Sequence, residues 1–423
     1  MTFEMWAALA IVCATVYGLI RRWETRLVLL TAGLAMCLIA LDPMAAFRQF
    51  DKSMTNSSLI IVICSAMGFA RVMTLTQCDL HLVALLTKPL NRLGILLLPC
   101  CMIVTGVVSL AISSLAGMCA AIGPTICALM IRAGFRPAMA ACTVIASTLP
   151  SFWSPGSSHN GFVAKLADWP IMEYLTYTGT RTLLISLVCI VVMVLACLVF
   201  KDYLKGGFAN DGVHEADKPV ELPANPNLLR AFAPILPVVL LFVVAIWMPG
   251  VKISVATAML VGVIYTLAVT RENPETLSKK FFEGMGGGYG STLGLIIAAG
   301  VFAAGLRSCG VIDVFVEALK GSSDLAKLGA AVGPYVLGVL TGSGDAAAFA
   351  FNEAVTPHAA MFGMTIPDLG YLASVAATFG RVSSPLAAGV IVISGIAGVS
   401  PLEVIKRSMP VQIITLAFLF MIS

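Results

Sequence analysis

The stretch TGSGDAAAFAFNEAVTPHA, residues 341–359, gathers ionisable side chains in a chain that otherwise has few of them. It carries Asp345, Glu353 and His358 among glycines and a proline. A carboxylate inside a membrane is costly and usually serves a cation, a proton or a basic partner. Asn352 and Glu353 follow Asp345 by about two helical turns and so share its helix face. We therefore predict that Asp345 and Glu353 couple transport to H⁺ or Na⁺, and that no other metal or cofactor is bound.

Structural alternatives stay open for both acids. Asp345 could instead cap the helix that follows, by accepting hydrogen bonds from its first N–H groups. Glu353 could instead pair with Arg381 or His358 and hold the fold. If Asp345 does bind a metal ion, we expect it to be Na⁺.

Arg381 and His159 are the basic candidates, and each lies beside an interruption in an apolar segment. A guanidinium can clamp a carboxylate through two parallel hydrogen bonds, or it can neutralise Asp345. His159 can donate to a substrate or serve the fold. We predict that the substrate-binding residues lie at four such interruptions and along the face of Asp345. They are Ser113, Ser114, Ser157, Ser158, His159, Asn160, Ser343, Gly344, Asn352, Arg381, Ser383 and Ser384.

The interruptions themselves indicate a binding site. Unpaired backbone groups cost several kcal/mol each in hydrocarbon, so irregular backbone survives there only inside protein or beside water. Helix N-termini at such breaks present free N–H groups and positive partial charge. Together with the serine hydroxyls, they favour a small anion.

The composition places these residues in a membrane. The chain is 59% hydrophobic and 11% charged, against about 25% charged in soluble domains. Repeated apolar runs near 20 residues predict an all-α polytopic membrane protein. The run 3–20 lacks a preceding basic region, so we expect a first span with its N-terminus outside. The net charge of +4 says little about nucleic acid, because the basic residues cluster at span ends, and no nucleic-acid partner is expected.

An internal repeat organises the chain. DPMAAFRQFDKSM (42–54) aligns with NPETLSKKFFEGM (273–285) at an offset of 231, and Ser154-Pro155 meets Ser384-Pro385 at an offset of 230. The nearby run Gly284–Gly290 is not followed by Gly-Lys-Ser/Thr, so close helix contact or a hinge is favoured over a phosphate loop.

Two units follow from this repeat, residues 1–200 and 231–423, joined by a cytoplasmic linker at 201–230. Each unit is expected to cross the membrane five times, so the second copy is inverted and about ten transmembrane helices result. Sixteen of the 26 basic residues then lie inside, which agrees with the positive-inside rule and places both termini in the periplasm. The expected re-entrant hairpins and broken helices are 93–131, 136–168, 326–362 and 367–398.

The motif SGDAAAFAFNEAVTPHA (343–359) after a glycine-rich apolar span resembles the anaerobic C4-dicarboxylate carriers of the DcuC type, within the ion transporter superfamily. The resemblance covers most of the chain. It implies an elevator-type carrier of succinate, fumarate or malate, acting as a homodimer in the bacterial inner membrane. Relatives with known sites use Ser-Asn-Thr triplets, and the matching positions here are Ser113-Ser114-Leu115 and Ser157-Ser158-His159.

Other functions are weighed against this one. Gly342-Ser343-Gly344-Asp345 matches the GxGD pattern of intramembrane aspartyl proteases, but the partner Tyr-Asp motif is absent, and such chemistry needs two carboxylates. We therefore predict a secondary carrier rather than an enzyme or an ion channel. Another small anion such as citrate, and uptake, efflux or exchange, all stay open.

Overall fold

Helices make up nearly all of the structure. The computed structural model describes residues 3–21, 23–87, 94–112, 114–204, 223, 225–247, 253–312, 314 and 323–423. It is 84% helical, and its β-structure within these ranges is one isolated bridge between Phe135 and Tyr203. The predicted all-α class is therefore confirmed.

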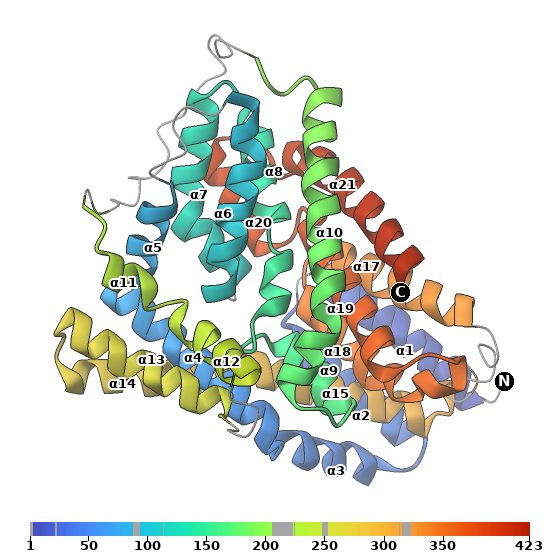
Figure 1. The fold of residues 1–423 in the computed structure, drawn as a ribbon. Helices are drawn as coiled ribbons and strands as arrows, with labels where there is room; N and C mark the ends of the chain where they lie inside the picture. The colour runs from blue at the N-terminus through green and yellow to red at the C-terminus, as the bar shows by residue number, and fades with distance from the viewer. Residues whose placement is uncertain are drawn as a thin grey trace.

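The helices of the first half of the chain, labelled as in Figure 1, are α1 (Phe3–Ile20), α2 (Thr25–Ile39), α3 (Pro43–Met54), α4 (Ser57–Thr76), α5 (Cys78–Thr87), α6 (Leu97–Ala111), α7 (Leu115–Arg132), α8 (Pro137–Ala146), α9 (Ser158–Leu166) and α10 (Ile171–Val199). Those of the second half are α11 (Leu228–Phe232), α12 (Leu236–Trp247), α13 (Val255–Thr270), α14 (Pro274–Gly288), α15 (Gly294–Ser308), α17 (Ser323–Thr341), α18 (Gly344–Ala354), α19 (Ile366–Val382), α20 (Ala388–Ala397) and α21 (Pro401–Ile422).

Polar side chains define where several of these helices begin. Ser114 caps α7, Ser343 caps α18 and Thr365 caps α19, each by accepting a hydrogen bond from an N–H group of the first turn. Such caps satisfy donors that have no partner within the helix. The local sequence therefore sets the start of the helices that follow the chain interruptions.

The chain is interrupted between α8 and α9 and again between α19 and α20. A 3₁₀ turn at Leu149–Trp153 and extended residues separate the first pair, and residues 383–387 separate the second. In addition, α6 ends at Ala111 and α7 begins at Leu115, and the chain turns at 342–343 between α17 and α18. Gly342 has φ +71°, a backbone conformation that favours glycine.

Four helices in the described part of the chain are long and apolar enough to cross a bilayer, by length and composition: Leu59–Thr76, Ile171–Val199, Pro274–Ser308 and Pro401–Ile422. A bent pair within α7 would add a fifth, and five apolar helices are shorter. These helices are not all parallel, because α10 stands upright in Figure 1, whereas α14 lies nearly horizontally at the lower left, beside the shorter α13. The predicted count of ten crossings and the inverted relation stay predictions.

One long helix differs from the expected layout. The predicted span near 288–306 is not separate, because α14 continues through a π-helical turn, η4 (Tyr289–Leu293), into α15. The helix thus runs from Pro274 to Ser308. A side chain or a distorted turn commonly lets a long helix bend without breaking.

Glycines bring some of these helices into close contact. A Cβ on Gly338 of α17 would lie 2.7 Å from the carbonyl oxygen of Ala377 in α19, and one on Gly284 of α14 would lie 2.7 Å from that of Met67 in α4. Small residues at such positions let helix backbones approach, which is how helices pack in membranes. The expected close helix contact is therefore present at Gly284, whereas Gly286, Gly287 and Gly290 face open space.

The helix α10 is joined to other helices at two places. In its first half, Arg181 pairs with Asp368 of α19. Just beyond its end, Asp202 is fully buried and accepts a 3.0 Å hydrogen bond from Nη2 of Arg407 in α21. The backbone oxygen of Asp202 also accepts from the N–H of Arg136, 2.9 Å away at the start of α8. Buried charges of this kind survive only when they are paired.

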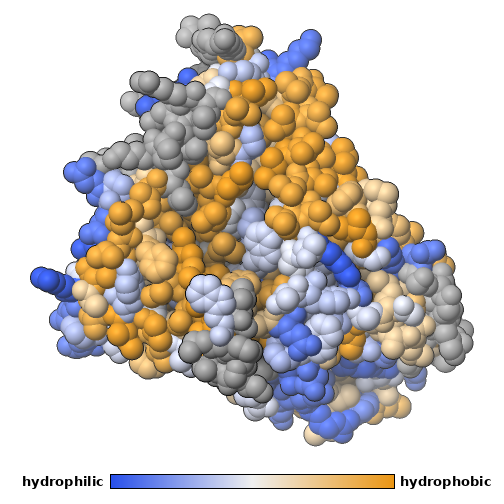
Figure 2. Space-filling model, in the orientation of Figure 1, coloured by the Kyte–Doolittle hydropathy of each residue, from blue (hydrophilic) through white to orange (hydrophobic). Residues whose placement is uncertain are grey.

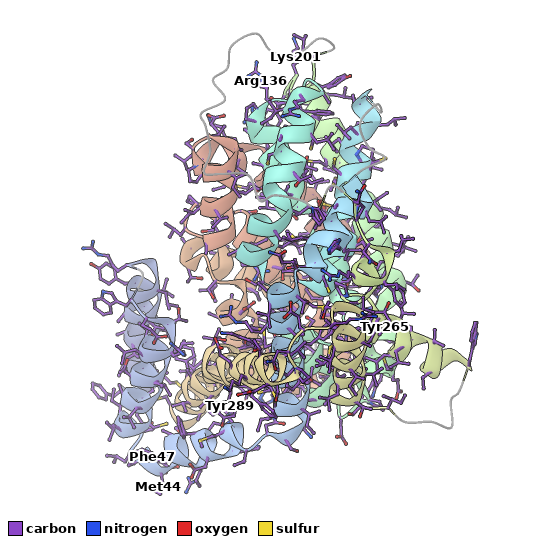
Figure 3. The ribbon with its side chains drawn as sticks, turned by 90° about the vertical axis from the view of Figure 1, so that its left-hand side faces the viewer. Met44, Phe47, Arg136, Lys201, Tyr265 and Tyr289 are labelled. Carbon is purple, nitrogen blue, oxygen red and sulfur yellow. The ribbon has the colours of Figure 1, made fainter. Side chains whose placement is uncertain are left out.

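Apolar side chains cover much of the outer surface, as Figure 2 shows. On α10 an outward stripe at four-residue spacing includes Leu187, Val191 and Leu195, which are 51%, 58% and 54% exposed. Figure 3 places Arg136 and Lys201 at one end of the molecule and Met44 and Phe47 at the other. A broad exposed apolar surface is typical of contact with lipid.

Candidate functional site

A cavity of about 390 Å³ lies where the chain interruptions meet. Its walls come from residues within or beside each interruption and from two long helices. The lining residues are Ile63, Met67, Ser109, Ser114, Leu115, Ala116, Ser151, Phe152, Ser154, Gly156, Ser157, Ser158, His159, Ser291, Thr292, Leu295, Gly342, Ser343, Gly344, Asp345, Thr378, Arg381, Ala388 and Gly389. Its volume lies within the range of small-molecule sites.

Four helix N-termini converge on this cavity. The first residues of α7, α9, α18 and α20 all line it, from Leu115, Ser158, Gly344 and Ala388 onward. Side chains cap α7 and α18, whereas α9 and α20 have no side-chain cap. The uncapped N–H groups and the helix dipoles together create a site that favours negative charge.

Asp345 is the acid of the cavity, and it faces two basic side chains. Its Oδ1 lies 3.0 Å from Nε2 of His159 and 3.3 Å from Nη1 of Arg381. The Asp345 side chain is 37% exposed and that of Arg381 is 19% exposed, so the pair is in contact with the cavity. The hydrogen bond that caps α18 comes from Ser343, and Asp345 instead binds across the cavity. The capping alternative for Asp345 is therefore wrong.

His159 is held in place by aromatic rings. Its ring stacks on Phe349 of α18 at a centroid distance of 5.3 Å and lies 5.9 Å from Phe152. Its Nδ1 is buried without a hydrogen-bond partner among the described residues. The ring therefore links the start of α9 to Asp345 and keeps its orientation through packing.

The Arg381 guanidinium has bonding capacity left over. One nitrogen, Nη1, bonds Asp345, while Nε is buried without a partner in the described part of the chain. A guanidinium has five N–H donors. A bound carboxylate could therefore compete with Asp345 for a donor group that is only partly used.

The structure brings most of the predicted binding residues to the cavity wall. Those at the cavity are Ser114, Ser157, Ser158, His159, Ser343, Gly344 and Arg381, together with the predicted coupling residue Asp345. Ser113 lies outside the described residues.

Four predicted residues do not line the cavity, because they bond elsewhere or are buried in the turns. Asn160 donates to the carbonyls of Phe152 and Ser154, at 2.8 and 2.9 Å, and so holds the irregular backbone before α9. Asn352 donates to Ser374 and accepts from Thr356. Ser383 is fully buried, and the Ser384 hydroxyl accepts from the N–H of Leu386.

Glu353 lies away from Asp345, on the side of α18 that contacts α15. Its Oε1 accepts a 3.3 Å hydrogen bond from Gln49 of α3, and its backbone oxygen lies 3.5 Å from Nη1 of Arg307. No ion pair joins Glu353 to Arg381 or His358 among the described residues, so the structural alternative for Glu353 is absent there. The prediction that Glu353 shares the face of Asp345 is also wrong, because Glu353 instead contacts Gln49 and Arg307.

Sequence inspection missed part of the cavity wall. Ser109, Ser151 and Thr378 are isolated hydroxyl residues within apolar helices or turns, and nothing in their local pattern marks them. Ser291, Thr292 and Leu295 come from the π-turn and from α15. The adjacent glycine run was the available signal, and it pointed to packing or a hinge.

Comparison with known families gives an independent result. The family model described as DcuC, C4-dicarboxylate anaerobic carrier, matches residues 36–423. A putative uncharacterized transporter of Haemophilus influenzae is 39% identical over 63% of this chain and 98% of its own length. A probable anaerobic C4-dicarboxylate transporter DcuC of Vibrio cholerae is 28% identical over 96% of this chain and 95% of its own.

A solved structure supports the fold. The YdaH transporter of Alcanivorax borkumensis superposes with a TM-score of 0.67, at 14% identity, over 89% of this chain and 86% of that one. Identity this low shows similarity of fold alone. The relatives that match in sequence are named as transporters, so the intramembrane protease alternative has no support and a non-enzyme is indicated.

Proposed function

Since the chain belongs to the DcuC family of C4-dicarboxylate anaerobic carriers, a family of multi-pass membrane transporters, we propose that it carries C4-dicarboxylates across the bacterial inner membrane. Succinate, fumarate and malate are the proposed substrates. The observation that supports this most directly is the cavity itself, where four helix N-termini and Arg381 surround one small space. Such a site favours a compact anion without a bound metal.

The Asp345–Arg381 pair suggests how ion binding and substrate binding are coupled. While Asp345 is charged, its carboxylate occupies Nη1 of Arg381. A proton or Na⁺ arriving at Asp345 would neutralise that carboxylate and free the guanidinium for a substrate carboxylate. His159, which bonds the same oxygen, would then orient Asp345 or take part in the proton transfer.

Movement of the loaded site is proposed to be of the elevator type. The hairpin tips and broken helices that surround the cavity would move together past the helices that carry Ile63, Met67 and Thr292. We further propose a homodimer, with both termini in the periplasm. Glu353, at the contact of α18 with α15, is proposed as a second coupling position.

The test is transport of labelled succinate into proteoliposomes containing the purified full chain. A pH gradient and a Na⁺ gradient are imposed separately, and internal succinate is added in a third arm. Uptake driven by either gradient, or dependent on internal substrate, supports the proposal and separates symport from exchange. No flux of any C4-dicarboxylate in all three arms would refute it, and flux of citrate alone would assign a different organic anion.

A further inference from the structure

The cavity has a wall that belongs to neither the hairpins nor the broken helices, and this wall contains the π-turn η4. Ser291 and Thr292 of the turn line the cavity together with Leu295 of α15. π-Turns are rare and occur frequently at functional sites. The π-turn therefore lies where its side chains can contact a bound ligand.

The π-turn shifts the hydrogen bonds of the long helix by one residue. The N–H of Gly294 bonds the carbonyl oxygens of Tyr289 and Ser291, so the oxygen of Gly290, which it would meet in an α-helix, loses that partner. Nη1 of Arg26 replaces it, at 2.6 Å. Glu24 in turn pairs with Arg26. A side chain from α2 thus stabilises the distorted turn.

Thr292 differs from Ser291 beside it and from two threonines of α13. Thr266, Thr270 and Ser291 each donate to the carbonyl four residues earlier, at 2.6–2.7 Å. Within the described chain the Thr292 hydroxyl has no hydrogen-bond partner, although its side chain is half-buried at the cavity wall. Its donor is therefore available to a ligand.

We propose that Thr292 is a specificity-determining residue that binds the second carboxylate of a small dicarboxylate, while Arg381 binds the first. This inference rests on the proposed function. Asp345, His159 and Arg381 form one polar cluster of the cavity, and Thr292 is carried by a separate helix of the same cavity. A ligand with two carboxylates can use both groups, whereas a monocarboxylate can use only one. Arg26 is a positioning residue that acts through the turn.

The test compares succinate with butyrate, which has the same carbon count and lacks the second carboxylate. Binding to the purified full chain is measured by calorimetry for wild type, Thr292→Val and the control Thr270→Val, whose hydroxyl donates within α13 away from the cavity. Loss of a hydrogen bond to a charged group is expected to weaken succinate binding about tenfold. Butyrate binding should not change, and the control should match wild type for both ligands.

Equal succinate affinity in wild type and Thr292→Val would overturn the inference, as would an equal loss for both ligands. Absence of succinate binding in wild type is a failure of the proposed function, which is seen before any variant is compared and removes this inference with it.

A second measurement does not depend on affinity. Thr292→Cys is treated with a negatively charged methanethiosulfonate reagent, and modification of that residue is followed by peptide mass spectrometry. Modification that is slowed by saturating succinate supports the inference. Modification that is equally fast with and without bound succinate contradicts it.

Discussion

Replacing Asp345 with asparagine tests whether this carboxylate competes with the substrate for Arg381. Asparagine keeps the size of the side chain and removes its charge. The Nη1 group of Arg381 would then lose its charged partner at 3.3 Å and become available to a substrate carboxylate. The variant is therefore expected to bind succinate more tightly than wild type, while losing dependence on the coupling ion.

The size of the effect follows from the geometry of the pair. Hydrogen bonds to charged groups contribute about 1.5–3 kcal/mol. The Asp345 side chain is 37% exposed and the contact is long, so the lower value applies because solvent screens the pair. About 1.5 kcal/mol corresponds to roughly tenfold in affinity. The opposite change, Arg381→Gln, should weaken binding by at least the same factor.

The assay is equilibrium binding of succinate at pH 8 without Na⁺, where wild type carries the fewest coupling ions. Asp42→Asn is the control, because Asp42 forms an exposed pair with Arg48 outside the cavity and asparagine can still cap α3. Weaker binding by Asp345→Asn under these conditions would refute the competition. It would show instead that Asp345 contributes directly to holding the substrate.

Three further changes test the packing and the charges of the fold. Arg407→Met leaves the buried carboxylate of Asp202 with only the longer, 3.6 Å contact to Nε of Arg136. It should cost about 3 kcal/mol of unfolding free energy, the lower end for breaking a buried pair, seen as a lower midpoint in thermal unfolding. Gly338→Ala places a methyl group 2.7 Å from the carbonyl oxygen of Ala377 and should cost about 1–3 kcal/mol, measured in the same way. Burial raises the pKa of Asp79, on α5 outside the candidate spans, to about 6. The folded state therefore holds that proton more tightly, stability falls as pH rises from about 4 through 6, and Asp79→Asn should flatten this part of the pH profile.

Control variants distinguish the loss of a specific contact from general destabilisation of the fold. Glu403→Gln removes a second, half-exposed partner of Arg407 and should cost far less than Arg407→Met. Gly363→Ala tests glycine replacement where no neighbouring atom lies within 4 Å but φ is +73°, so its cost reflects backbone strain alone. An unchanged midpoint for Arg407→Met, or a parallel pH profile for Asp79→Asn, would contradict the reasoning.

The positions of the interruptions could be predicted from sequence because local chemistry determines them. The Ser-Pro pairs and Gly342, with its positive φ, disfavour a continuing helix, and Ser343 provides an N-cap for the next one. These signals were sufficient to predict Asp345 beside a turn. They were also sufficient to bring Ser157, Ser158 and His159 into the same set of candidates.

Pairings over long distances along the chain could not be predicted in this way. His159 meets Asp345 across 186 residues, and Arg407 meets Asp202 across 205. Such contacts depend on how helices pack, which the spacing within one helix does not encode. The same limit explains Asn160 and Asn352, whose amides were assigned to a ligand and instead bond neighbouring parts of the protein.

The contacts that α10 makes through Arg181 and beside Asp202 affect how the helices can move relative to one another. The first half of this 29-residue helix is joined to α19 through Arg181 and Asp368, and its C-terminal end is joined to α8 and α21 through Asp202. A single helix that is joined to its neighbours at two places keeps those neighbours at a fixed separation. Under the proposed elevator movement, the two broken-helix segments should therefore move together, and sliding should take place at faces that no ion pair joins within the described chain.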